Sequence, residues 1–213
     1  MPQRFFITGT DTGVGKTVAS ALLCAALDAI YWKPIQTGTR EGTDRDTVMR
    51  LAGLTRNRTL PEAYRFAPPV SPHLAASRAG VRIMLNKIQA PALAAEDNLI
   101  AEGAGGVLVP INETEMMCDL MSHLALPVLL VSRTSLGTIN HTLLSLAALR
   151  SAHQEVRGVI LVGKRNIENR KAIERYGSAA VVGFIPPLAK LDRTALLGVF
   201  RKNFDPDIFR PRA

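Results

Sequence analysis

The sequence predicts an α/β fold in which a doubly wound, mostly parallel sheet carries helices on both faces. Short, nearly all-apolar segments alternate with segments of helical pattern along the whole chain. Such alternation implies right-handed strand–helix–strand crossovers, and parallel strands covered on both sides are apolar throughout. The length of 213 residues predicts one domain, residues 1–213, large enough for a well-buried core.

The expected strands lie at residues 5–8, 31–35, 98–101, 107–109, 128–131, 156–162 and 181–185. The expected helices lie at residues 16–29, 44–52, 83–95, 138–151, 167–176 and 194–202. Residues 54–81 form the longest irregular stretch, and loops of that length are often functional. Ligands of such sheets bind at the carboxyl ends of the strands, so functional side chains are expected there.

A glycine-rich turn joins the first strand to the first helix. Residues 9–17 read GTDTGVGKT, and the Gly-Lys-Thr at their end is the signature of a phosphate-binding loop, or P-loop. Its backbone N–H groups and the helix start would hold phosphate oxygens. Lys16 would reach the β- and γ-phosphates, and the Thr17 hydroxyl would bind Mg²⁺. The first glycine is Gly9, one residue earlier than usual, yet the strand and helix around the loop predict a nucleoside triphosphate site.

Charged residues stand in three further segments at or after the ends of strands or at a helix start. Lys33 lies in the second strand, near the strand-end face expected to hold the phosphates, and the alternative is an ordinary surface lysine. Asp44 and Asp46 stand at the start of a helix. Acidic residues favour helix N-termini, so one of the two could be a helix cap instead of a site residue. Glu102 ends a hydrophobic strand before a Gly-rich turn, the position at which P-loop proteins place a second Mg²⁺ group.

A helix start follows the strand at residues 128–131. The free N–H groups of the segment SLGTINH, residues 135–141, could hold a carboxylate. Simple capping by Thr138 is the alternative.

The bulk composition predicts a cytoplasmic globular protein. Hydrophobic residues make up 47% and charged residues 21%, and no apolar run approaches the roughly 18 residues that a membrane span needs. Cys24 and Cys118 lie in apolar segments without metal-ligand spacing, which favours buried thiols in a reducing compartment. The net charge of +8 comes mostly from residues 150–213, with 13 Lys and Arg against 6 Asp and Glu. A solvated basic face is expected there, with no nucleic-acid partner and no membrane partner, because this part has few aromatic residues for base stacking and no known binding motif.

Several segments in a fixed order give the chain a resemblance to the dethiobiotin synthetase family. They are FITGTDT leading to GKT (residues 6–17), KP (33–34), FAPP with SPH (66–73), EGAGG (102–106), LPV (126–128) and LGTINH (136–141). The resemblance is good over residues 4–150 and weaker beyond. It implies closure of a ureido ring on 7,8-diaminopelargonate with CO₂ or bicarbonate, Mg²⁺ and ATP, through a carbamate and a carbamic–phosphoric anhydride. It also implies a homodimer with the active site at the interface.

The resemblance assigns roles to individual residues. Lys16 and Lys33 match the catalytic lysines, and Thr17, Asp46 and Glu102 match the Mg²⁺ ligands. The nucleotide-binding positions are Gly13, Val14, Gly15, Lys16, Thr17, Val18, Asp46, Glu102, Gly103, Ala104, Gly105, Pro186, Pro187 and Leu188. The substrate-binding positions are Thr12, Thr37, Gly105, Gly106 and Asn140.

The chain departs from the family at two positions. Gly13 stands where some members carry Glu, and Val162 stands near where many members carry the Asn that reads adenine. Asn166, which follows, is displaced along the chain.

The rival interpretation is a partition or septum-site ATPase acting as a nucleotide-switched binding module. Those proteins carry a second lysine at the position of Asp11, so the charge there is reversed.

Overall fold

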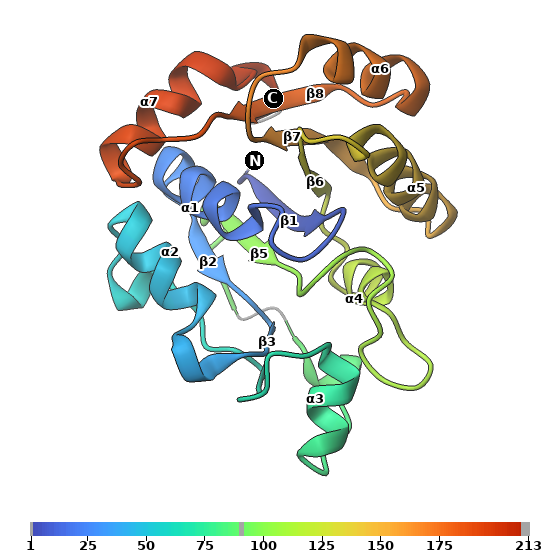
Figure 1. Cartoon of the computed structure of the whole chain (residues 1–213). Helices are drawn as coiled ribbons and strands as arrows, with labels where there is room; N and C mark the ends of the chain where they lie inside the picture. Colours follow the sequence, from blue (N-terminus) through green and yellow to red (C-terminus); the bar gives the residue numbers. More distant parts are fainter. Residues whose placement is uncertain (1, 90–91, 210–213) are drawn as a thin grey trace.

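The structure, a computed structural model, describes residues 2–89 and 92–209 and is built on a six-stranded parallel sheet (Figure 1). Its strands occur in the order β2 (Ile30–Trp32), β5 (Leu99–Glu102), β1 (Arg4–Gly9), β6 (Val128–Arg133), β7 (Val156–Val162) and β8 (Val181–Ile185). All five strand pairings are parallel. The predicted α/β fold with a mostly parallel sheet is therefore confirmed.

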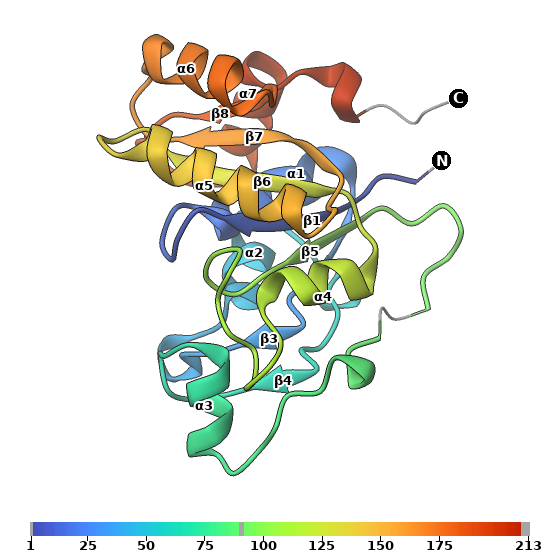
Figure 2. The same ribbon diagram turned by 90° about the vertical axis from the view of Figure 1, so that its right-hand side faces the viewer.

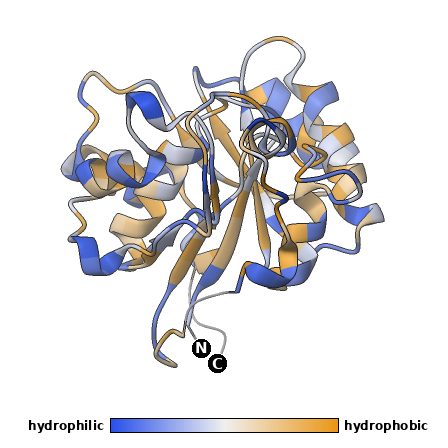
Figure 3. Cartoon of the chain, turned by 90° about the horizontal axis from the view of Figure 1, so that it is seen from below, coloured by the Kyte–Doolittle hydropathy of each residue, from blue (hydrophilic) through white to orange (hydrophobic). Residues whose placement is uncertain are grey.

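Helices cover both faces of the sheet. One face packs against α1 (Lys16–Leu27), α2 (Asp44–Ala52) and α7 (Arg193–Asn203), which lie on the left in Figure 1. The other face packs against α4 (Met117–Leu124), α5 (Thr138–Ser151) and α6 (Ile167–Gly177) on the right. Alternate residues of each strand enter the two cores, and Figure 3 shows the strands as a mainly hydrophobic layer between helices with hydrophilic outer surfaces.

A smaller lobe extends from the β2 edge of the sheet. The chain leaves the main sheet after Trp32 and forms β3 (Ile35–Gln36), which pairs in parallel with β4 (Tyr64–Arg65). The helix α3 (Pro72–Arg78) lies beside this pair (Figure 2). Short 3₁₀ turns occupy Thr39–Glu41, Arg56–Arg58, Leu85–Lys87 and Pro206–Phe209.

Three of the expected strands and helices are wrong. Residues 107–109 form a turn, because Cys118 and Met117 donate backbone hydrogen bonds to the carbonyls of Val107 and Val109 and hold the segment against the start of α4. The described part of the segment 83–95 has no α-helix and contains only the 3₁₀ turn Leu85–Lys87, while residues 90 and 91 lie outside the described part. The segment 31–35 is split at Lys33-Pro34 between two sheets, since proline cannot donate to the β-ladder.

Both cysteines are buried free thiols, as predicted. In the part of the chain that the structure describes, no helix is long and apolar enough to cross a membrane.

Candidate active site

The phosphate loop lies between β1 and α1 and borders a pocket of about 660 Å³. Its last glycine, Gly15, adopts φ +104, and a Cβ there would come within 3.0 Å of Val162 at the end of β7. Only glycine fits this position, because the left-handed backbone and the close neighbour both exclude a side chain. Gly15 and the first residues of α1, Lys16 and Thr17, line the pocket, and the free N–H groups of a helix start suit phosphate binding.

Lys16 is the buried cation of the loop. Its side chain folds back along the turn, and Nζ donates a hydrogen bond to the Asp11 carbonyl at 2.9 Å. Burial lowers the pKa of Lys16 to about 8, although the negative charge of Glu102 partly opposes this shift. An anion bound in the pocket would place a negative charge beside the Lys16 amine and would favour its protonated form.

Two carboxylates converge on the pocket next to the loop. Glu102 ends β5 and is 1% exposed. The Thr17 hydroxyl lies 3.0 Å from Glu102 Oε1 and 2.8 Å from Asp44 Oδ1. Lys33 Nζ donates to Glu102 Oε1 at 3.2 Å and to Asp44 Oδ2 at 2.5 Å. Four side chains from four separate segments therefore meet at one point, and we call them the carboxylate–lysine cluster.

Electrostatics hold Lys33 and Asp44 of this cluster in their charged forms. Burial disfavours the charged amine of Lys33, but Glu102 and Asp44 outweigh it, so the pKa of Lys33 is raised. Burial likewise opposes ionisation of Asp44, yet Lys33 and the Thr17 hydroxyl lower its pKa. Lys33 is a buried member of the site and not a surface lysine.

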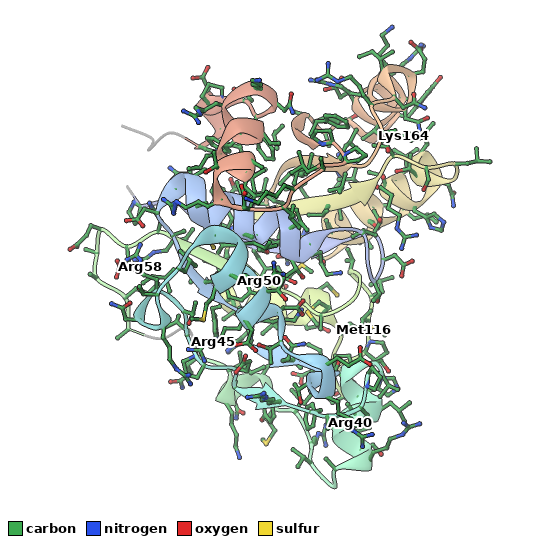
Figure 4. All side chains as sticks on the ribbon, turned by 60° about the vertical axis from the view of Figure 1, so that its left-hand side comes forward. Arg40, Arg45, Arg50, Arg58, Met116 and Lys164 are labelled. Carbon is green, nitrogen blue, oxygen red and sulfur yellow. The ribbon has the colours of Figure 1, made fainter. Side chains whose placement is uncertain are left out.

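Asp44, rather than Asp46, faces the pocket. Asp46 is exposed and forms a capping box with Thr43, whose backbone N–H and hydroxyl both donate to Asp46 Oδ2. Arg45 between them points elsewhere and donates to Thr59 (Figure 4). The first turn of α2 thus sends three successive side chains in three directions. The resemblance implied Asp46 as the site residue, but Asp44 lines the pocket and Asp46 belongs to the capping box.

Tyr31 is a site neighbour that the sequence analysis missed. It lies in β2 beside β5, where Tyr31 pairs with Ile100. Its hydroxyl donates to Glu102 Oε2 at 3.1 Å in a fully buried position. Burial, followed by the charge of Glu102, raises the pKa of Tyr31 well above its usual value. A signal was present, since Tyr31 stands two residues before Lys33 and side chains two apart share a strand face.

The structure gathers some of the other predicted residues around the pocket. The lining includes Thr12, Gly13, Val18, Thr37, Ala104 and Gly105. Gly103 packs on the Phe6 ring and Gly106 on the backbone of Gly9, so both make room without lining the pocket. The pocket lining does not include Val14, which is buried beneath the loop, nor Asn140, Pro186, Pro187 and Leu188.

A second hollow, of about 110 Å³, lies on the other side of the loop. It is lined by Thr10, Asp11, Val14, Ser132, Arg133, Ser135, Leu136, Thr138 and His141. Arg133, at the end of β6, donates to the Thr12 carbonyl at 2.8 Å and lies 3.7 Å from Asp11 Oδ2. Arg133 therefore fastens the first half of the phosphate loop to the neighbouring strand.

Val162 stands at the end of β7, near the position at which many dethiobiotin synthetases carry an asparagine. Val162 is half-buried against Gly15. Asn166 caps α6, and its side-chain oxygen accepts hydrogen bonds from the N–H groups of Glu168 and Asn169. The Asn166 oxygen is thus already used within its own helix.

Comparison with known proteins gives close relatives over nearly the full length. A family model described as an AAA domain matches residues 3–195. An ATP-dependent dethiobiotin synthetase of Nitrobacter hamburgensis is 46% identical over 209 residues, covering 98% of each chain. The enzyme of that name from Brucella anthropi is also 46% identical with the same coverage. The one from Rhodopseudomonas palustris strain HaA2 is 45% identical, covering 98% of this chain and 97% of the relative.

Solved structures with the same fold are more distant. A ParA family ATPase from Chlorobium tepidum has a TM-score of 0.54 and 14% identity, covering 94% of this chain and 93% of that chain. A chain of the MinC:MinD cell division complex from Aquifex aeolicus has a TM-score of 0.54 and 15% identity, covering 99% and 97%. At these identities the likeness shows the fold alone.

Proposed function

This chain belongs to the dethiobiotin synthetase family. From that premise we propose that the ureido ring of dethiobiotin is closed in the pocket beside the phosphate loop. The enzyme is an ATP-dependent ligase of biotin biosynthesis, with 7,8-diaminopelargonate, CO₂ and ATP as its substrates. The observation that carries this proposal is the carboxylate–lysine cluster beside the phosphate loop. A partition or septum-site ATPase is not favoured, because the named relatives are synthetases and Asp11 replaces the second lysine.

The phosphate loop supports nucleotide binding. Backbone N–H groups at Gly13, Gly15 and the start of α1 would hold the phosphate oxygens. Lys16 would donate to the transferred phosphoryl group, and its pKa of about 8 leaves it mostly protonated at neutral pH. Because the pocket lining omits residues 186–188 and Val162 has no polar group, we propose that adenine is held by backbone and apolar contacts.

The donor set fits a magnesium ion. Thr17, Glu102 and Asp44 offer one hydroxyl and two carboxylates within one small space, and hard oxygen donors are what Mg²⁺ prefers. We propose these three as the ligands, with Asp44 in place of Asp46. When bound, the ion would neutralise the charge that develops on the phosphate oxygens.

Lys33 then has a defined role in the reaction. One amine of the substrate adds to CO₂ and loses a proton, which gives a carbamate. A carbamate oxygen attacks the γ-phosphorus and ADP leaves, forming the anhydride. The second amine attacks the carbamoyl carbon, the ring closes, and phosphate leaves with loss of a proton. Lys33, buried and held protonated, supplies a fixed positive charge to the anionic carbamate and to the phosphoryl group in transfer.

The substrate would lie across the pocket and reach a second subunit. Thr12, Thr37 and Gly105 line the pocket and would bind the amine end. Asn140 is exposed near the start of α5, and Leu136 and Leu144 beside it are 105% and 62% exposed. We propose that this apolar face forms a two-fold dimer interface, so that Asn140 binds the substrate carboxylate from the neighbouring subunit.

A direct synthesis assay tests the proposal. The protein is mixed with 7,8-diaminopelargonate, bicarbonate, Mg²⁺ and ATP, and dethiobiotin is measured by mass spectrometry together with released phosphate. Wild-type protein should give both products, whereas a Lys16→Ala variant that remains folded should give neither. Wild-type protein that binds nucleotide but forms no ureido product would contradict the proposal.

A further inference from the structure

The carboxylate of Glu102 has two oxygens in different surroundings. Oε1 faces the pocket, where Thr17 and Lys33 contact it at 3.0 Å and 3.2 Å. Oε2 points back toward the sheet and accepts a hydrogen bond from the Tyr31 hydroxyl at 3.1 Å. Among the described residues, Oε2 has no other hydrogen-bond partner. One oxygen therefore belongs to the pocket, and the other is bound by a residue of the core.

The strand register explains how Tyr31 reaches this position. Tyr31 pairs with Ile100 in the parallel ladder between β2 and β5. Side chains two residues apart share a face, so Glu102 lies diagonally beyond Ile100 on the face that Tyr31 occupies. Both Tyr31 and Ile100 pack in the core beneath α1 and are fully buried. The phenol ring is thus fixed by packing before its hydroxyl reaches Glu102.

A buried carboxylate without fixed partners can rotate about its last bond. Burial of a charged group is costly unless hydrogen bonds compensate. The Tyr31 hydroxyl donates a hydrogen bond to Oε2 and carries no charge. It therefore offsets part of the cost of burying the Glu102 carboxylate without neutralising it, so the carboxylate can still bind a cation in the pocket. A second positive group there would instead compete with the cation.

We propose that Tyr31 is a positioning residue for Glu102. It ties Oε2 to β2, keeps the carboxylate plane fixed, and leaves Oε1 as the single oxygen that Glu102 offers to a divalent cation. This inference rests on the proposed function, in which Glu102 binds Mg²⁺. Tyr31 itself does not touch substrate or metal.

The test compares the affinity for a divalent cation in matched variants. Tyr31→Phe removes only the hydroxyl, and Tyr176→Phe, at a 66% exposed tyrosine, is the control. Mn²⁺ binding is measured by electron paramagnetic resonance in the presence of ADP, and ADP binding is measured separately without metal. Partners of this kind typically change metal affinity by 10–100-fold. We expect the Mn²⁺ dissociation constant to rise about 10-fold in Tyr31→Phe, with metal-free ADP affinity and the control unchanged.

A double variant separates positioning from general loss of stability. If Tyr31 acts through Glu102, adding Tyr31→Phe to a Glu102→Gln protein should change Mn²⁺ affinity no further. Tyr31→Met, which also lacks the hydroxyl, replaces Tyr31→Phe if thermal unfolding shows that the latter is not folded at the assay temperature.

Three results would overturn the inference. Mn²⁺ affinity in Tyr31→Phe within twofold of wild type would do so, as would an additive effect in the double variant. Failure of the wild-type protein to bind Mn²⁺ at all would overturn the proposed metal site as well. Normal wild-type binding with an unaffected Tyr31→Phe variant would refute the role of Tyr31 alone.

Discussion

Replacement of Lys33 by methionine tests the carboxylate–lysine cluster most directly. Methionine keeps a long, unbranched side chain and removes the charge, so the cavity effect is small. Lys33 has a side-chain exposure of 7%, and its partners Glu102 and Asp44 have exposures of 0% and 29%. Removing one partner of a buried ion pair leaves the other charge uncompensated and costs about 3–5 kcal/mol.

The expected loss of unfolding free energy lies near the lower end of that range. Asp44 is partly exposed, so water screens its half of the interaction. We expect Lys33→Met to lower the free energy of unfolding by about 3 kcal/mol, or roughly 6–12 °C in melting temperature for a chain of this size. Turnover should fall about 10²–10³-fold, as with loss of one electrostatic donor.

Added Mg²⁺ should restore part of the lost stability. With Lys33 gone, Glu102 and Asp44 remain as an uncompensated pair, and a cation that binds only the folded state stabilises it. Urea unfolding of both proteins with and without Mg²⁺ measures the effect, and Lys164→Met, at an exposed lysine (Figure 4), is the control. The reasoning is refuted if Lys33→Met loses less than about 1 kcal/mol and keeps wild-type turnover.

Three more predictions follow from the site. Asp44→Asn should lower Mg²⁺-dependent turnover at least about 10²-fold, whereas Asp46→Ala should cost about 1 kcal/mol of stability through loss of its capping-box bonds with Thr43, with turnover kept; equal turnover in the two variants would refute the assignment of Asp44, rather than Asp46, to the site. The pKa of Lys16 is lowered from 10.5 to about 8, so the unfolded chain binds more protons between these values and the free energy of unfolding should rise with pH across that window. Over the same window ATP affinity should fall as Lys16 loses its charge, and a flat pH profile for ATP titrations would speak against this role. Because Val162 has no polar group and the Asn166 oxygen is used as a cap, the KM values for ATP, GTP and CTP should agree within about tenfold, and a strong preference for ATP in steady-state assays would show an adenine contact that is absent from these residues.

The phosphate loop and the main sheet could be predicted because their patterns are local. The Gly-Lys-Thr signature sits between an apolar strand and a helix, and each of these features is visible within about 20 residues. Glu102 was predictable for the same reason, since an ionised group directly after an apolar strand has few structural roles. These predictions needed no knowledge of the rest of the chain.

The choice between Asp44 and Asp46 could not be made from spacing. Both residues suit the first turn of a helix, and which one caps depends on the residue at the N-cap, Thr43, and on where the helix enters the fold. Residues 107–109 misled for a related reason. They are apolar, as a strand would be, but their backbone partners come from the start of α4, ten residues further on.

An aromatic cluster joins Phe5 of β1 to three phenylalanines in residues 200–209. Phe5 packs edge-to-face against Phe209 at 5.7 Å, and Phe209 in turn contacts Phe200 and Phe204. The strand that carries the phosphate loop is synthesised well before residues 200–209, which pack against its first half. A nascent chain therefore cannot complete the packing around Phe5 until residue 209 has been synthesised, and a product truncated before Phe200 lacks Phe209, the ring that packs on Phe5.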